Sequence, residues 1–212
     1  MKAEYVLSLA LIIAAFVVSA WAYPNLPDKV AGHWNASGEV NGYMPKFWGL
    51  FLMPFVMALM LPLFMAIPRI DPLKKNILQF IGYFRMLVLV LFGFFFYIHM
   101  LIIFANLGVA FNMTVMMLPA IALLFYFLGI VIENARQNWF VGIRTPWTLS
   151  SRRVWDRTHK LGGKLFRVVA LLALAATFMG EFGLFVFIAA AIAVSFYLVA
   201  CSYFEYRKES GK

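Results

Sequence analysis

The sequence predicts an all-α integral membrane protein with six transmembrane helices. Hydrophobic residues make up 64% of its 212 residues and charged residues only 13%, whereas a soluble domain is about half apolar and a quarter charged. Six apolar runs are long enough, or nearly so, to cross a bilayer, which takes roughly 20 residues in a helix. The positive charges lie mainly between these runs, as they do in multi-pass membrane proteins.

The apolar runs alternate with polar segments along the whole chain. They comprise residues 5–23, 47–67, 86–104, 113–132, 165–179 and 184–204. Pro54 and Pro62 should kink the second run, because proline cannot donate a helical hydrogen bond. We divide the chain into residues 1–67 with two spans and a patterned outer loop, residues 68–132 with spans three and four, and residues 133–212 with a patterned inner loop, two spans and a polar tail.

Lysine and arginine are distributed very unequally over the two sides of the predicted bundle. Lys29 and Lys46 lie on one side, and the other 16 of the 18 lie on the opposite side. Because cytoplasmic loops carry the excess of positive residues, we expect a plasma-membrane protein with both termini in the cytoplasm. The outer loop, residues 24–46, then faces the exterior, and the inner loop, residues 134–164, faces the cytoplasm.

The formal charge of +9 does not indicate a nucleic-acid-binding protein. The positive residues lie in short segments beside apolar runs, where they set orientation and meet anionic lipid headgroups. We therefore expect no direct contact with nucleic acid. The single cysteine, Cys201, lies inside an apolar run, so it cannot form an intrachain disulfide and should pack as a small apolar residue.

The outer loop is rich in proline and glycine, which prevents a continuous helix. Asn41-Gly42 is a favourable turn dipeptide. His33 and Glu39 could ligate a metal, but no spacing in this loop matches a known metal cage. A self-folded lid, a ligand-recognition loop and a structural metal site remain the alternatives, and we expect the first, with no metal or cofactor.

The inner loop concentrates polar and aromatic residues between two apolar runs. Pro146 should stop any helix through Thr145, and a serine at position 150 or 151 could cap the next helix. Trp155 and His159 are four residues apart and should share one face of that helix. The segment is either an interfacial element that docks on the bundle or a protein-docking surface.

Within the spans, His99 is the one histidine, and ionisable groups inside bilayers are costly. We expect it to be neutral and hydrogen-bonded to a neighbouring helix, with a functional role as the alternative. Met53, Met57 and Met60 recur at helical spacing, which favours packing over an adaptable peptide-binding surface.

Two acidic residues lie at the ends of spans or in a turn, and no catalytic signature accompanies them. Glu133 and Arg136 should pair with each other, and Glu181 should be solvated. The sequence has no phosphate-binding glycine loop, no paired-histidine zinc helix and no serine elbow, so we do not expect an enzyme.

Both patterned loops resemble the SdpI family of bacterial and archaeal membrane proteins. The outer loop carries Leu26-Pro27-Asp28, His33-Trp34-Asn35, Gly38-Glu39 and Gly42-Tyr43, similar to the domain of unknown function that usually opens these proteins. The inner loop carries Asn138, Phe140, the string GIRTPWT from Gly142 to Thr148, Val154-Trp155 and Thr158-His159. Two positions depart from the family pattern: Asn41, where an aspartate is common, and Arg152-Arg153, where acidic residues are frequent.

The resemblance implies a membrane immunity protein that is also a signal receptor. Such a protein neutralises a secreted, membrane-active peptide toxin and, when toxin is present, holds a cytoplasmic repressor at the membrane. Its implied partners are membrane lipid, a hydrophobic peptide toxin and a cytoplasmic repressor protein.

The resemblance also carries over the residues expected to bind these partners. The cytoplasmic partner-binding residues would be Asn138, Trp139, Phe140, Gly142, Arg144, Thr145, Pro146, Trp147, Thr148, Trp155 and His159. Trp147, Trp155 and Arg144 are the expected anchors, because aromatic and arginine side chains dominate binding hot spots. The extracellular ligand-recognition residues would be Pro27, Asp28, His33, Trp34, Asn35, Gly38, Glu39, Gly42 and Tyr43.

Two rival functions remain open. A metal-dependent membrane hydrolase could use His33, Glu39 or His159, although the predicted topology puts His33 and His159 on opposite sides. A small-solute or peptide transporter is suggested by the kinked second span and by two three-span halves that would be inverted in the membrane. No residue-level repeat between the halves is evident.

Overall fold

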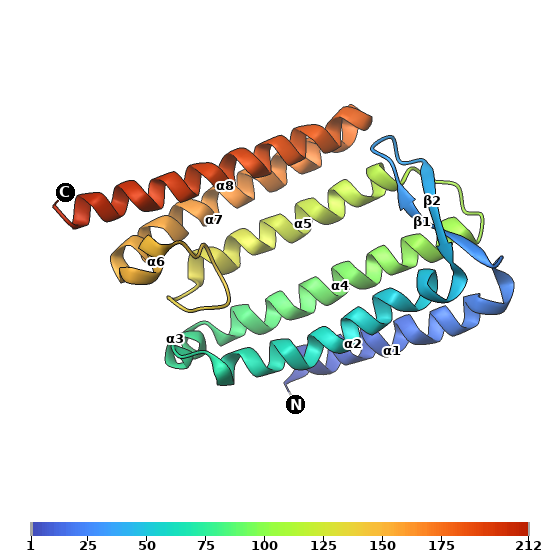
Figure 1. The fold of residues 1–212 in the computed structure, drawn as a ribbon, viewed down its shortest axis with the longest axis horizontal. Coiled ribbons are helices and arrows are strands. Elements are labelled where there is room, and N and C mark those ends of the chain that lie inside the picture. The colour runs from blue at the N-terminus through green and yellow to red at the C-terminus, as the bar shows by residue number, and fades with distance from the viewer. Residues whose placement is uncertain (1, 212) are drawn as a thin grey trace.

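The computed structural model describes residues 2–211 and is dominated by six long helices (Figure 1). These are α1 (Ala3–Ala22), α2 (Lys46–Ile70), α4 (Ile81–Asn106), α5 (Met113–Asn134), α7 (Arg152–Ala176) and α8 (Glu181–Glu209). All six are long and apolar enough to cross a membrane. The predicted class is therefore confirmed, and the chain is a multi-pass membrane protein.

Shorter elements connect the long helices at the two ends of the bundle. One end carries the antiparallel strands β1 (Lys29–Trp34) and β2 (Val40–Pro45), preceded by the 3-10 turn η1 (Tyr23–Asn25). The opposite end carries α3 (Lys74–Gln79) and α6 (Pro146–Ser150) (Figure 1). A second 3-10 turn, η2 (Thr177–Met179), joins α7 to α8.

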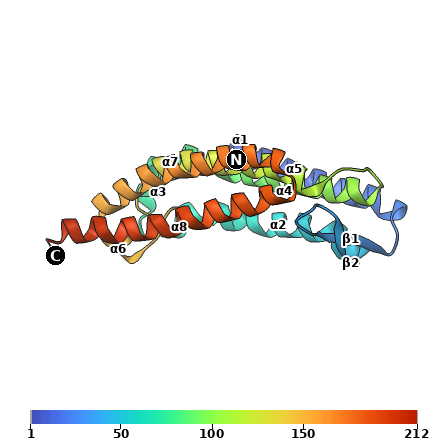
Figure 2. The ribbon, with the colours of Figure 1, turned by 90° about the horizontal axis from the view of Figure 1, so that it is seen from above.

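The long helices form two groups of three. Helices α1, α2 and α4 pack together, α7 packs against both α5 and α8, and α4 lies beside α5 where the two groups meet. Seen from above, the molecule is a shallow curved slab rather than a round bundle (Figure 2). Few residues of α8 are buried, so most of its surface is left to the bilayer.

Aromatic and methionine side chains fill the core of the N-terminal group. Phe84, Phe92 and Met57 are fully buried, and Met53 and Met60 pack against the same cluster. The methionine stripe is thus packing, as its helical spacing indicates. Burying large apolar side chains between helices maximises van der Waals contact, which drives helix association inside lipid.

His99 ties the three helices of this group together. Its Nε2 lies 3.0 Å from the Ser19 hydroxyl and 3.2 Å from the Ala15 carbonyl, and the Ser19 hydroxyl lies 2.7 Å from the Leu50 carbonyl. A carbonyl only accepts, so Nε2 carries the proton that bonds to α1. The expected interhelical hydrogen bond is therefore confirmed.

Glycines bring α5 and α7 unusually close together. A Cβ added to Gly129 would collide with the Gly163 carbonyl oxygen, and one added to Gly163 would collide with Glu133 and the Gly129 carbonyl. Small residues allow such close backbone approach between membrane helices. Arg167 of α7 donates to Glu133 of α5 at 2.6 Å across this contact.

The prediction that Glu133 pairs with Arg136 is wrong. Helix α5 ends at Asn134, so the three-residue spacing does not place these two side chains on one helical face. Glu133 instead pairs with Arg167, and Arg136 lies 3.9 Å from Asp156.

The outer loop folds into the β-hairpin, but its turn is not the predicted one. Asn41 and Gly42 lie inside β2, and the chain reverses between Asn35 and Glu39. The Asn35 side chain accepts from the Glu39 backbone amide at 2.9 Å, and Gly38 adopts a positive φ of 80°. The Asn35 side chain replaces a backbone hydrogen bond in this turn, so the chain reverses before it reaches Asn41-Gly42.

The hairpin contacts both helix groups. Asn106 of α4 bonds to both the amide and the carbonyl of Ala31, at 2.7 and 3.1 Å. At the tip, Thr114 of α5 donates to the Ala36 carbonyl at 3.0 Å, and Ser37 donates to Glu181 of α8 at 2.7 Å. Glu181 is exposed, as expected, and it also holds the hairpin tip.

The close α5–α7 contact gives a direct stability test. Replacing Gly163 with leucine should lower the thermal unfolding midpoint in detergent, because overpacking a tight site costs about 1–3 kcal/mol or more. Gly82→Leu is the matched control, since Gly82 is exposed and a Cβ added there meets no atom within 4 Å. Equal midpoints for the two variants would show that the glycine contact does not stabilise the bundle.

Candidate functional site

The inner loop between α5 and α7 is organised around the buried Asn138. Its side-chain amide donates to the carbonyls of Arg136 and Val141, each at 2.8 Å. Its Oδ1 accepts from the backbone amides of Phe140 and Val141, at 2.9 and 2.7 Å. All the hydrogen-bonding capacity of one side chain therefore goes into shaping this turn.

Trp155 and His159 form a second fixed point of the loop. They share a face of α7, as predicted, and their rings stack with centroids 3.8 Å apart. Trp155 Nε1 donates to the Ala135 carbonyl at 2.8 Å. Both rings are buried, so this pair forms the part of α7 on which the loop packs.

The hydrogen bonds of His159 define its protonation state. Its Nδ1 lies 2.9 Å from the Trp155 carbonyl, which can only accept, and its Nε2 accepts from the Ile143 amide at 3.0 Å. The ring is thus neutral with the proton on Nδ1. Gly142 lies against both rings with a φ of 126°, and a Cβ there would collide with His159.

Thr145 and Thr148 hold the next turn through a capping box. The Thr145 hydroxyl accepts from the Thr148 amide at 3.2 Å, and the Thr148 hydroxyl accepts from the Thr145 amide at 2.9 Å. Pro146 begins the short helix α6, where a missing N–H costs nothing. The Thr145 hydroxyl also lies 3.0 Å from Ser202 of α8, and Ser151 caps α7 as expected.

Only some of the predicted partner-binding residues of the inner loop are exposed. Trp139 and Phe140 are 49% and 38% exposed, and Arg144 and Pro146 are also exposed. Arg144 donates to the Trp139 carbonyl, which ties its guanidinium to the backbone of the same exposed segment. Trp147 is half-buried against Tyr203, with ring centroids 5.1 Å apart.

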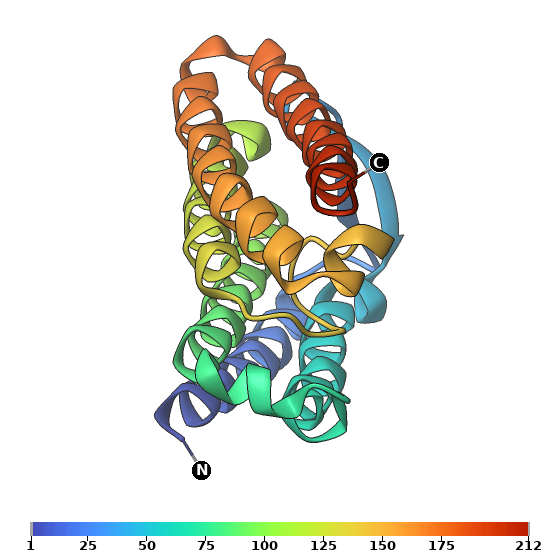
Figure 3. The same ribbon diagram turned by 90° about the vertical axis from the view of Figure 1, so that its left-hand side faces the viewer.

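An interaction that sequence reasoning missed joins the inner loop to the other helix group. Asp71, at the end of α2, is only 2% exposed, and its carboxylate accepts from the amides of Trp139 and Leu73, at 2.9 and 2.6 Å. Asn76 of α3 donates to the Gln137 carbonyl at 2.8 Å. The end-on view shows the loop crossing toward this group (Figure 3). The sequence offered one indication of this contact, because Asp71 is the single acidic residue in a basic loop.

A cavity of about 340 Å³ lies beside the hairpin, at the opposite end of the bundle. His33, Trp34 and Asn35 of the predicted recognition residues line it, together with residues of α4, α5 and α8 such as Ile102, Met117 and Leu184. Its lining is mainly apolar, with a few polar side chains such as His33, Asn35 and Thr114. It therefore suits an apolar ligand that carries a few polar groups.

The other predicted outer residues do not line this cavity. Asp28 is fully exposed and lies 3.7 Å from Lys46, and Glu39 is engaged with Asn35 in the turn. Tyr43 is exposed on β2. Gly38 and Gly42 shape the hairpin, and Pro27 precedes it.

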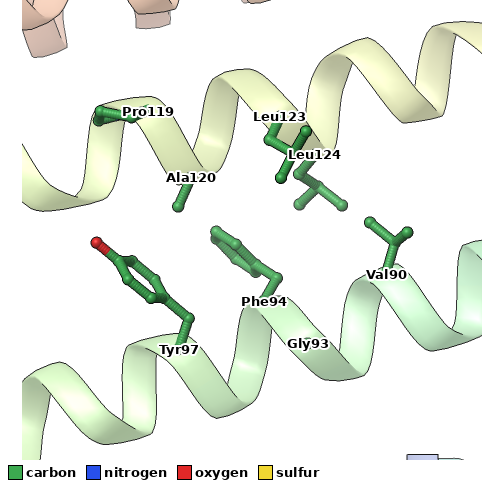
Figure 4. A pocket seen from close by; sticks show the side chains of 8 residues that line it. All are labelled: Val90, Gly93, Phe94, Tyr97, Pro119, Ala120, Leu123 and Leu124. Carbon is green, nitrogen blue, oxygen red and sulfur yellow. The ribbon is translucent and has the colours of Figure 1, made fainter. Parts of the chain in front are cut away.

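A second cavity lies between the middles of α4 and α5 (Figure 4). Its volume is about 490 Å³, and its lining is apolar apart from Tyr97. The Tyr97 hydroxyl donates to the Met116 carbonyl at 3.0 Å, one turn before Pro119. The two helix groups are therefore loosely packed along part of the line where they meet.

The residues considered for metal chemistry are dispersed. Across residues 2–211, no group of three or more His, Cys, Asp or Glu side chains is arranged to hold a metal ion. His33 and Glu39 lie in the hairpin, whereas His159 lies near the start of α7, at the other end of the bundle.

The comparisons with known proteins match both patterned loops. Residues 10–58 match the domain of unknown function DUF1648, and residues 134–201 match the SdpI/YfhL protein family. The chain is also 23% identical, over 207 residues and 97% of both chains, to the "Immunity protein SdpI" of Bacillus subtilis strain 168. No solved structure matches it significantly. With its six candidate membrane helices and both patterned loops, the chain is similar to the SdpI/YfhL family along its whole length.

Proposed function

We propose that this chain is a membrane immunity protein and signal receptor. In this proposal it neutralises a secreted, membrane-active peptide toxin and recruits a cytoplasmic repressor to the membrane. The name of the Bacillus relative supports the immunity role. One observation supports signalling between the two ends: at each end of the bundle a loop bonds to both helix groups.

The proposed orientation puts both termini and the inner loop in the cytoplasm. Lys29 and Lys46, on the hairpin and at the start of α2, are the only lysines or arginines outside in this arrangement. The inner end then carries the rest of the positive charge, in agreement with the bias of cytoplasmic loops. The toxin would meet the hairpin, and the repressor would meet the inner loop.

The cavity beside the hairpin is the proposed site for an apolar segment of the toxin. It is bounded by β1, by α4 of the N-terminal group, and by α5 and α8 of the C-terminal group. A ligand shifts a conformational equilibrium only if it favours one arrangement. An occupant that contacts both groups meets this requirement, because its contacts depend on how the groups are spaced.

The inner loop is placed to respond to the same spacing. The Asp71–Trp139 bond spans the two groups, so a relative shift would strain or release it. Trp139, Phe140 and Arg144 are the proposed contacts for the repressor, because exposed aromatic and arginine side chains make binding hot spots. Trp155 and His159, being buried, would act by holding these contacts in position.

Thiol labelling tests the proposed orientation. In a Cys201→Ser background, Val40→Cys should react with a membrane-impermeant maleimide in intact cells, because it lies exposed on the hairpin. Ser150→Cys, exposed in α6, should react only after lysis. The opposite labelling pattern would reverse the orientation and remove the receptor mechanism.

Toxin survival and repressor location test the function itself. The peptide fraction of medium in which the host has grown should kill host cells that lack the chain. Host cells that produce the chain should survive the same fraction. Trp139→Ala/Arg144→Ala should preserve survival but leave the proposed repressor, carrying a fluorescent tag, in the cytoplasm. This result is expected because the variant loses only the exposed recognition surface.

The control variant is Lys75→Gln, an exposed change at the same end of the bundle, which should keep both activities. Equal survival with and without the chain would contradict immunity. Membrane localisation of the repressor in the double variant would contradict the assigned surface.

A further inference from the structure

We infer that the cleft between α7 and α8 at the inner-loop end binds an anionic phospholipid. The cleft is a cavity of about 590 Å³. It has a charged mouth formed by Arg157, Glu205 and Lys208, and an apolar lining that includes Leu161 and Phe204. This combination matches one class of molecule at a membrane surface, a lipid with a phosphate headgroup and an acyl chain.

The charges at the mouth leave donors for a phosphate. Glu205 accepts from Arg157 at 2.6 Å and from Lys208 at 3.1 Å, so the trio carries one net positive charge. The Arg157 and Lys208 side chains are still 51% and 70% exposed. A guanidinium has five N–H donors, and it can therefore hold Glu205 and a phosphodiester at once.

A stripe of positive charge continues along α7 beside the cleft. Arg157, Lys160 and Lys164 recur at helical spacing and are all exposed, which puts them on one face. Helix α8 runs antiparallel to α7, because Arg157 meets Glu205 and Gly162 faces Leu198. The two lysines therefore lie at the level of an apolar part of α8.

The apolar part of the cleft faces the surroundings of the bundle. Tyr197 and Phe204 are 55% and 56% exposed. They lie at the level of Lys160 and Lys164, whose charged groups need lipid headgroups or water around them. Lysine side chains can reach out of hydrocarbon toward phosphates. A lipid bound here would satisfy the cations with its phosphate and cover the two rings with its acyl chain.

The floor of the cleft also carries an unsatisfied polar group. Thr158 lines the cavity and is 1% exposed, and its hydroxyl has no hydrogen-bond partner among residues 2–211. Buried hydroxyls normally find partners. An ester or phosphate oxygen of a lipid is a suitable acceptor for this one.

Cys201 provides a reporter within the cleft without any engineering. It is the single cysteine of the chain and lines the same cavity. The experiment measures the alkylation rate of Cys201 by N-ethylmaleimide in the full-length protein in detergent. Phosphatidylglycerol and phosphatidylcholine with identical acyl chains are added in parallel, with glycerol phosphate as a third arm.

Phosphatidylglycerol should slow alkylation, and phosphatidylcholine should have little effect. Arg157→Gln/Lys208→Gln should weaken this protection by about tenfold, given the attraction of each basic residue for anionic lipid. Lys208→Gln alone, at a highly exposed position, should weaken it less and leaves folding untouched. Lys74→Gln/Lys75→Gln removes the same charge outside the cleft and should retain full protection.

Three results would overturn the inference. Equal protection by both lipids would mean that the cleft binds an acyl chain without selecting an anionic headgroup. Protection by glycerol phosphate alone would mean that the site takes a free anion rather than a lipid. Absence of protection by either lipid would mean that no lipid occupies the cleft.

Discussion

The two groups of three helices are held together mainly by hydrogen bonds at the two ends of the bundle. Between the ends, α4 and α5 meet along a line with an apolar cavity beside it. At one end the hairpin bonds to Asn106 and Glu181. At the other, Asp71 bonds to the inner loop. Since a buried carboxylate needs its hydrogen bonds, the Asp71 contact strongly favours a closed inner end.

This arrangement explains why so much of the inner motif is buried. Asn138, Thr145, Thr148, Trp155 and His159 hydrogen-bond the loop to itself and to α7. They give the loop one shape, and only a few side chains are left to contact a partner. A rigid loop transmits a change of spacing better than a flexible one, because its exposed residues then move together.

The sequence predicted the features that depend on local or bilayer physics. The six spans, the serine cap of α7, the shared face of Trp155 and His159 and the bonded His99 all follow from hydrophobic length, capping or helical period. The interactions that it missed join groups far apart in the chain. Glu181 meets Ser37, and Asp71 meets Trp139, and no periodicity encodes such pairs. The Asn41-Gly42 turn failed because the Asn35 side chain stabilises an earlier reversal.

The most direct test of the account is whether the outer end controls the inner end. Spin labels at Lys75→Cys and Lys164→Cys, in a Cys201→Ser background, report the spacing of the two groups near the inner loop. Breaking the hairpin tip contacts with Ser37→Ala/Thr114→Val should shift or broaden this distance by about 2 Å or more, the scale of helix shifts in switching proteins. An unchanged distance distribution would contradict the coupling between the two ends.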